Sequence, residues 1–158
     1  MSNNFASASN TFIYYKTAGF AIKKVYQLQE NTLFLDMSKQ IISDLKIIAA
    51  YNCAQNIEKN NPNIVNIIHI NVYEIHTPAQ SLEEYKEALK SNKISYTSKT
   101  WKGLTGVEYI IKQDMGEVML PTKAFYGFKG NKFYLIQLGS LTDYANKYDL
   151  LLNSIKIL

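Results

Sequence analysis

The clearest pattern of hydrophobic and polar positions lies in residues 125–140, FYGFKGNKFYLIQLGS. Aromatic and β-branched residues, which favour strands, fill two short runs on either side of a Gly-Asn pair. Such a pair suits a two-residue hairpin loop, which would place Phe128 opposite Phe133. The same register would place Tyr126 opposite Leu135. The segment therefore predicts a β-hairpin with an aromatic cross-strand face.

Several other segments have strand patterns. Residues 12–24, FIYYKTAGFAIKK, predict two short strands around a turn glycine, and LFLDM at 33–37 predicts a third. The longest predicted strand covers residues 64–76, IVNIIHINVYEIH. Ile68 and Val72 lie on one apolar face of it, while the other face mixes polar and apolar residues. One buried and one partly polar face is typical of an antiparallel sheet.

Two interpretations of residues 38–61 stay open. The segment could be a helix that ends before Pro62, because five apolar residues follow helical spacing: Ile42, Leu45, Ala49, Cys53 and Ile57. Alternatively LKIIAAYNC is a strand and AQNIEKNNPN a polar loop. We favour the strand, because residues 64–76 would then be its hairpin partner.

Two helices are predicted. In SLEEYKEALKS, residues 81–91, Ser81 and Glu84 fit a capping box, and an apolar stripe follows helical spacing. Exposed Glu-Lys pairs at i,i+3 support this helix. The last helix is predicted from residue 141 to Ile155, capped by Ser140 or by Thr142. Its apolar stripe is Leu141, Tyr144, Ala145, Tyr148, Leu151, Leu152 and Ile155.

The order of elements indicates the fold class. After the first helix, KISYTSKTW, TGVEYIIKQD and MLPTKAFYGF read as consecutive strands that lead into the hairpin. Strands, a helix, a four-strand meander and a closing helix are typical of an antiparallel α+β domain. No repeat or linker divides the chain, so we expect residues 12–158 to form a single domain.

Composition narrows the classes of partner. Apolar residues make up 47% of the 158 residues, which is enough for a core, and no apolar run is long enough for a transmembrane segment. The net charge of +4 comes from lysine alone, because the chain has no arginine. Arginine makes the bidentate contacts by which proteins read nucleic acids, so we expect no specific nucleic-acid binding.

The N-terminal segment, residues 1–11, is small and polar. It lacks the charged and apolar regions of an export signal, and we expect it to be disordered or the remnant of a trimmed leader. If a leader was removed, the protein is periplasmic or a lipoprotein. If none was, it is cytoplasmic. The localisation is therefore not predicted.

Few residues suggest chemistry. His69 and His76 are seven residues apart on one predicted strand and therefore point to opposite faces. Cys53 is the single cysteine and lacks a surrounding nucleophile motif. An enzyme would need these residues to meet a carboxylate in a pocket. We predict no catalytic, cofactor-binding or metal-binding residues.

The second half of the chain resembles PsbP-like domains. The resemblance rests on the SLEEYKEALKS helix, on GVEYIIKQ, on the hairpin AFYGFKGNKFYLIQLGS and on the last helix, and covers residues 81–158. AGFAIKK adds weaker support, although Val25 stands where the family usually has proline. The resemblance implies a three-layer α-β-α sandwich around a mainly antiparallel sheet. It also implies a tendency to bind other proteins, with no shared catalytic residues.

The many tyrosines have two interpretations: most are core or edge residues of the sheet, or some of them form an interaction surface. Tyrosine combines a large contact area with a polar tip, and lysines nearby would suit an acidic or peptide-like partner. Tyr14 and Tyr15 belong to the same aromatic set. The residues that we expect to form this surface are Tyr96, Lys99, Trp101, Lys102, Lys123 and Tyr126.

The sequence thus favours a non-catalytic binding module. Its expected partner is another protein or a peptide, and a homodimer is a further expectation. The second hypothesis is a secretion-associated chaperone or an immunity-type protein that sequesters an apolar segment. A small enzyme is the third.

Overall fold

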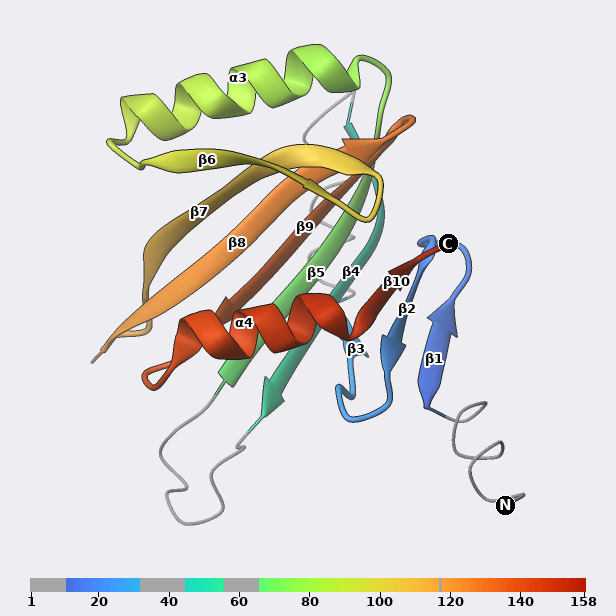
Figure 1. Cartoon of the computed structure of the whole chain (residues 1–158), viewed down its shortest axis with the longest axis vertical. Coiled ribbons are helices and arrows are strands. Elements are labelled where there is room, and N and C mark those ends of the chain that lie inside the picture. The colour runs from blue at the N-terminus through green and yellow to red at the C-terminus, as the bar shows by residue number, and fades with distance from the viewer. Residues whose placement is uncertain (1–10, 32–44, 56–65, 117) are drawn as a thin grey trace.

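A computed structural model describes residues 11–31, 45–55, 66–116 and 118–158. Strands dominate it, and they form two antiparallel sheets (Figure 1). The large sheet contains, in spatial order, β3 (Gln29–Glu30), β4 (Leu45–Gln55), β5 (Asn66–Ile75), β9 (Lys132–Gly139), β8 (Met119–Lys129), β7 (Leu104–Asp114) and β6 (Tyr96–Trp101). The small sheet contains β1 (Phe12–Tyr15), β2 (Phe20–Lys23) and β10 (Ile155–Ile157). The described helices are α3 (Pro78–Ser91) and α4 (Tyr144–Asn153).

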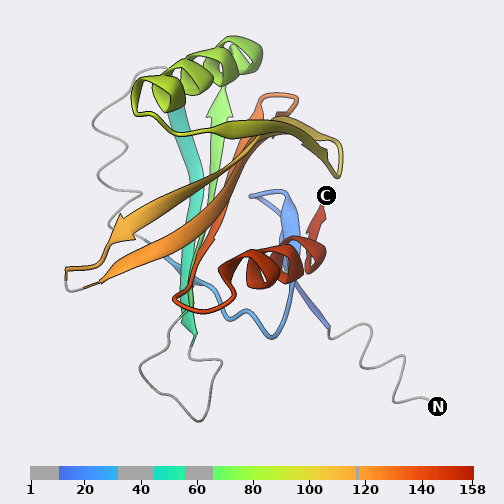
Figure 2. The same ribbon diagram turned by 60° about the vertical axis from the view of Figure 1, so that its left-hand side comes forward.

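The large sheet has a hydrophobic core on each face. In β5, Ile70 belongs to one core and Tyr73 to the other, as alternation along a strand requires. The first core lies under α4 and the small sheet and includes Phe20, Phe125, Tyr148 and Ile155. The second lies under α3 and includes Leu82, Leu89, Val107 and Phe133. Figure 2 shows α3 at the upper end of the large sheet and α4 lower down, beside the small sheet.

The predicted three-layer α-β-α sandwich is wrong. One face of the large sheet is covered by a second β-sheet together with α4, and not by a helical layer. The main reason lies at the C-terminus. The predicted last helix ends at Asn153, and Ile155 belongs instead to β10, which pairs with β2 through Ile155 and Ile22. Leu141 precedes the helix and is exposed.

Several local predictions are confirmed. The hairpin β8–β9 turns at Gly130 and Asn131 and pairs Phe128 with Phe133, as the sequence predicts. LKIIAAYNC lies within strand β4, which pairs with β5. The strands β1 and β2 and the meander from β6 to β9 also agree with prediction. Ala54 and Gln55, predicted as the start of the polar loop, still belong to β4. The predicted strand at 33–37 and residues 38–44 and 56–61 lie outside the described residues.

The first helix begins earlier than predicted. Helix α3 starts at Pro78, which stands at one of its first two positions, and Thr77 is its N-cap. Proline suits this position because the first helical N–H groups have no partner within the helix. Ser81 therefore lies inside the helix, where its N–H donates to the Thr77 carbonyl. The two predicted Glu-Lys pairs are present, Glu83–Lys86 at 2.9 Å and Glu87–Lys90 at 3.4 Å.

A short contact joins the two sheets. The Tyr134 hydroxyl, on β9, donates to the carbonyl oxygens of Ala18 at 3.2 Å and Gly19 at 3.1 Å, in the β1–β2 turn. Gly19 has a φ of +84°, which favours glycine. A Cβ there would lie 2.7 Å from the Tyr134 hydroxyl. The turn can therefore approach the large sheet this closely only with glycine.

Candidate binding site

Strand β7 extends beyond its neighbour β6. The β6–β7 ladder runs from Trp101–Leu104 to Tyr96–Tyr109, whereas β7 continues to Asp114 and stays paired with β8. No other described strand pairs with β7 beyond Tyr109. The β7–β8 hairpin projects from the body of the sheet in Figures 1 and 2. Within the described chain, β7 thus has an open edge over Ile110–Asp114.

Hydrogen bonding around Pro121 shows which β7 backbone groups face this open edge. The Ser140 N–H donates to the Pro121 carbonyl at 3.0 Å, so the backbone of Pro121 is directed towards β9. Lys112 lies opposite Pro121 in the β7–β8 ladder. Since the backbone groups of Pro121 point to β9, Lys112 and Pro121 form a pair without hydrogen bonds between them. The N–H and C=O of Lys112 therefore point away from β8. Backbone direction alternates along a strand, so Asp114 also presents its N–H and C=O to the open edge.

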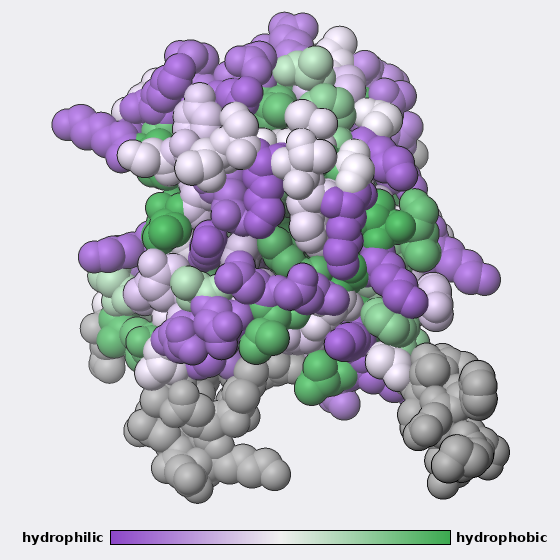
Figure 3. All heavy atoms as spheres, viewed as in Figure 1, coloured by the Kyte–Doolittle hydropathy of each residue, from purple (hydrophilic) through white to green (hydrophobic). Residues whose placement is uncertain are grey.

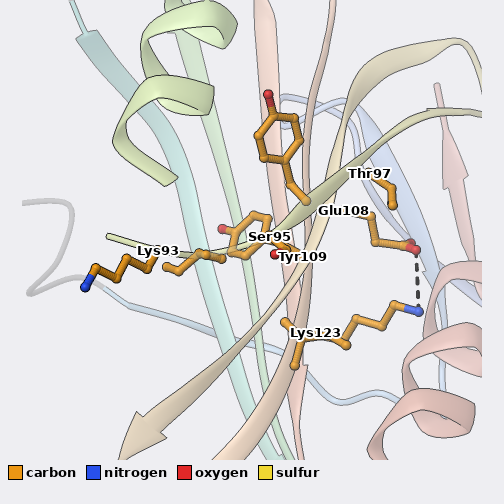
Figure 4. A pocket seen from close by; sticks show the side chains of 9 residues that line it. Lys93, Ser95, Thr97, Glu108, Tyr109 and Lys123 are labelled. Carbon is orange, nitrogen blue, oxygen red and sulfur yellow. Dashed lines mark ion pairs between the residues drawn. The ribbon is translucent and has the colours of Figure 1, made fainter. Parts of the chain in front are cut away.

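A hollow of about 530 Å³ lies where β6 and β7 part. Figure 4 shows its lining side chains, with Glu108 and Lys123 joined by an ion pair. Its residues come from the α3–β6 connection, from β6, from β7 and from β8. They are Lys93, Ile94, Ser95, Tyr96, Thr97, Glu108, Tyr109, Ile110 and Lys123. The hollow therefore adjoins the first residue of the open edge.

Glu108 is the centre of a charged cluster beside the hollow. Its Oε2 accepts hydrogen bonds from Lys99 Nζ at 2.7 Å and from the Tyr148 hydroxyl at 2.9 Å. Its Oε1 lies 3.4 Å from Lys123 Nζ. The Glu108 side chain is 14% exposed, so these contacts are partly shielded from water. Two lysines share one carboxylate, and the cluster carries a net positive charge.

Burial and hydrogen bonding have opposite effects on the pKa of Glu108. Burial raises it, but the hydrogen bonds from Lys99 and Tyr148 and the charges of Lys99 and Lys123 together lower it below its ordinary value. The Tyr148 pKa is raised, first by burial and then by the Glu108 carboxylate. Glu108 is therefore ionised and Tyr148 is a protonated donor at neutral pH. Lys123 Nζ also lies 5.3 Å from the centre of the Tyr148 ring.

Exposed apolar side chains lie along the projecting β7–β8 hairpin. Ile110, Met115, Val118 and Met119 are 46% to 51% exposed. Figure 3 shows hydrophobic side chains at the lower left, where the β7–β8 hairpin ends in the view of Figure 1. Apolar side chains that gather beside free backbone groups indicate an interaction surface.

The structure distributes the six predicted surface residues over several places. Lys99 and Lys123 meet at Glu108, and Tyr96 lines the hollow. Trp101 is buried and packs edge-on against Phe125, with ring centres 5.5 Å apart. Trp101 is therefore a core residue.

The other two predicted residues have structural contacts. Tyr126 is half-buried and stacks on Tyr85 and Phe133, with ring centres 4.0 Å and 4.6 Å away. Lys102 donates hydrogen bonds to the carbonyl oxygens of Leu152, at 3.2 Å, and Ile155. It thereby ties the β6–β7 turn to the end of α4 and to the start of β10.

The candidate catalytic residues do not converge. Cys53 pairs with Ile68 and His69 with Asn52, so Cys53 and His69 point to opposite faces of the sheet. Burial raises the pKa of Cys53 and lowers that of His69. His76 follows the end of β5 and is exposed. Among the described residues, no group of three or more metal-ligating side chains could hold a metal ion.

Sequence reasoning missed Glu108 and the open edge. A single glutamate within a predicted strand looks like an ordinary exposed residue, and only the register with Thr97 and Phe125 places it between lysines. The predicted strands KISYTSKTW and TGVEYIIKQD have nine and ten residues, so their lengths carried no signal that β7 outruns β6.

Comparisons with known proteins provide no further identification. No protein-family model matches the chain, and no curated protein is detectably similar to it. None of the helices in the described ranges has the length and apolar character needed to cross a bilayer. The site must therefore be interpreted from its own geometry.

Proposed function

We propose that the protein is a non-catalytic binding module that binds an extended segment of a protein partner as an added strand on β7. The observation that carries this proposal is the open edge over Ile110–Asp114, where β7 outruns β6. Strand addition supplies affinity through backbone hydrogen bonds and specificity through alternate side chains.

The surroundings of the edge support this mode of binding. The backbone groups of Lys112 and Asp114 face outward, and exposed apolar side chains lie beside them. The hollow next to Ile110 is flanked by Lys93 and Lys123. An acidic side chain of the added strand would find a positive charge there.

The lining of the hollow favours this function over the chaperone hypothesis. A chaperone for apolar segments needs a groove without charged side chains in its lining, whereas Lys93, Glu108 and Lys123 lie among the apolar residues that line this hollow. Four exposed apolar residues lie instead on the β7–β8 hairpin, beside the free backbone groups: Ile110, Met115, Val118 and Met119.

Proline substitution tests the proposal. Lys112→Pro removes an outward N–H and leaves the β7–β8 hydrogen bonds in place, because Lys112 makes none of them. Ser98→Pro is the matched control. Thr97 is opposite Glu108 and bonds to β7, so the N–H of Ser98 points outward from the edge of β6.

Tagged wild-type protein and both variants are used to capture proteins from the soluble and membrane fractions of the source organism. We expect one reproducible partner that wild type and Ser98→Pro retain and Lys112→Pro loses. Circular dichroism checks that both variants keep their fold. If folded Lys112→Pro retains everything that wild type retains, strand addition at β7 is wrong.

A further inference from the structure

We propose that the β7 edge is self-complementary and binds the same edge of a second copy of this chain, with Lys112 of each copy opposite Asp114 of the other. This inference rests on the proposed strand addition and names its partner. It follows from the direction of the backbone groups and from the order of charges along the edge.

Backbone direction restricts the registers that two copies can adopt. In an antiparallel pair related by a two-fold axis, residues with outward N–H and C=O groups must lie opposite one another. Lys112 and Asp114 are such residues, and Ile110 has the same parity. A register with Lys112 opposite Ile110 of the second copy would place Asp114 of that copy opposite Glu108. Glu108 already pairs with Thr97 of β6, so that register is blocked.

Charge selects among the remaining registers. Lys112 opposite Lys112, or Asp114 opposite Asp114, would place like charges directly across from each other, which destabilises a strand pair. Lys112 opposite Asp114 gives two attractive pairs, one on each side of the two-fold axis. The axis then passes between Gln113 and its copy, which are compatible as neutral amides.

The same register covers apolar surface. Ile111 lies opposite Met115 of the second copy, on the same side of the joined sheets. Met115 is 46% exposed and Ile110 is 50% exposed in the single chain. Ile110 comes to lie opposite Gly116 of the second copy, which has no side chain to obstruct the approach. The two large sheets thus join into one continuous sheet.

Charge reversal tests the register directly. In Lys112→Asp, each pair between copies becomes Asp opposite Asp, and in Asp114→Lys each becomes Lys opposite Lys. In a mixture of the two variants, one copy carries aspartate at both positions and the other carries lysine at both, so the two pairs are attractive again. Asp114 Oδ1 accepts a hydrogen bond from the Gly116 N–H at 2.9 Å, so Asp114→Asn, which keeps that acceptor, serves as an intermediate control.

The measurement is molar mass and dissociation constant by analytical ultracentrifugation of the full chain. We expect wild type to form a dimer of twice 18.1 kDa. Each single variant should weaken the dimer by about tenfold or more, with the Asn control in between. An equimolar mixture of the two variants should dimerise about as tightly as wild type.

Three results would overturn the inference: a wild type that stays monomeric up to millimolar concentration, single variants that dimerise like wild type, or a mixture that stays monomeric although both variants are folded. The proline variant separates this failure from that of the proposed function. If wild type is monomeric but captures a foreign protein that Lys112→Pro does not capture, strand addition is supported and self-pairing is wrong. If Lys112→Pro still dimerises and also retains every captured protein, both are wrong.

Discussion

At the scale of residues, Glu108 holds the strands near the candidate site to α4. Its carboxylate joins Lys99 of β6, Lys123 of β8 and Tyr148 of α4. A partly buried carboxylate needs such partners, since an unpaired one would be costly. The cluster therefore fixes the wall of the hollow beside the open edge of β7.

The depressed pKa of Glu108 predicts a pH dependence of stability. Ionised Glu108 stabilises the fold above its ordinary pKa of 4.5, and this contribution is lost as the pH falls through the lower folded pKa. Glu108→Gln should reduce the free energy of unfolding by about 1 to 2 kcal/mol at pH 7. Urea titrations from pH 7 to pH 2.5 should show this difference shrinking below pH 4.5. A difference that stays constant with pH would contradict the assignment.

Gly19 is the residue whose replacement should disturb the contact between the sheets. Gly19→Ala places a Cβ at a φ of +84° and 2.7 Å from the Tyr134 hydroxyl. The backbone conformation alone costs about 1 kcal/mol, and the collision adds to it. Gly130→Ala is the control, because φ there is +60° and nothing lies within 4 Å of the added Cβ. Chemical denaturation should show the larger loss for Gly19→Ala, and equal losses would argue against the collision.

At the scale of elements, local signals were reliable and long-range ones were not. The hairpin β8–β9 could be predicted because its loop residues and its alternation lie within sixteen consecutive residues. Strand β10 could not, because three residues are too few to show a period of two and its partner β2 lies at the other end of the chain. Ile155 also fits the helical stripe of α4, so the periodicity continued past the true end of the helix.

The assignment of Ile155 to β10 predicts a pair of unequal substitutions. Ile155 is 1% exposed and packs in the first core, whereas Leu150 on α4 is 54% exposed. Ile155→Ala should lower the free energy of unfolding by about 2 to 5 kcal/mol. Leu150→Ala should change it by about 0.5 kcal/mol or less. Similar small effects of both substitutions would contradict the burial of Ile155 under the small sheet.

At the scale of the whole molecule, the described part of the chain leaves β7 paired on one side only over Ile110–Asp114. The sequence predicted Lys99 and Lys123 as parts of a basic surface, and the registers of β6 and β8 bring them to Glu108. The open edge itself could not be predicted, because it depends on where β6 stops beside β7. The proposal that the protein binds by strand addition rests on this mismatch in length and not on any motif.

The most direct test of strand addition is the hydrogen exchange of two backbone amides. The N–H groups of Lys112 and Asp114 point to the open edge, so in the free monomer we expect them to exchange quickly, while those of Ile111 and Gln113, which face β8, exchange slowly. Residue-resolved exchange by NMR, followed as protein concentration rises or as a captured partner is added, should show Lys112 and Asp114 becoming protected. Binding that leaves both amides exchanging freely would contradict the account.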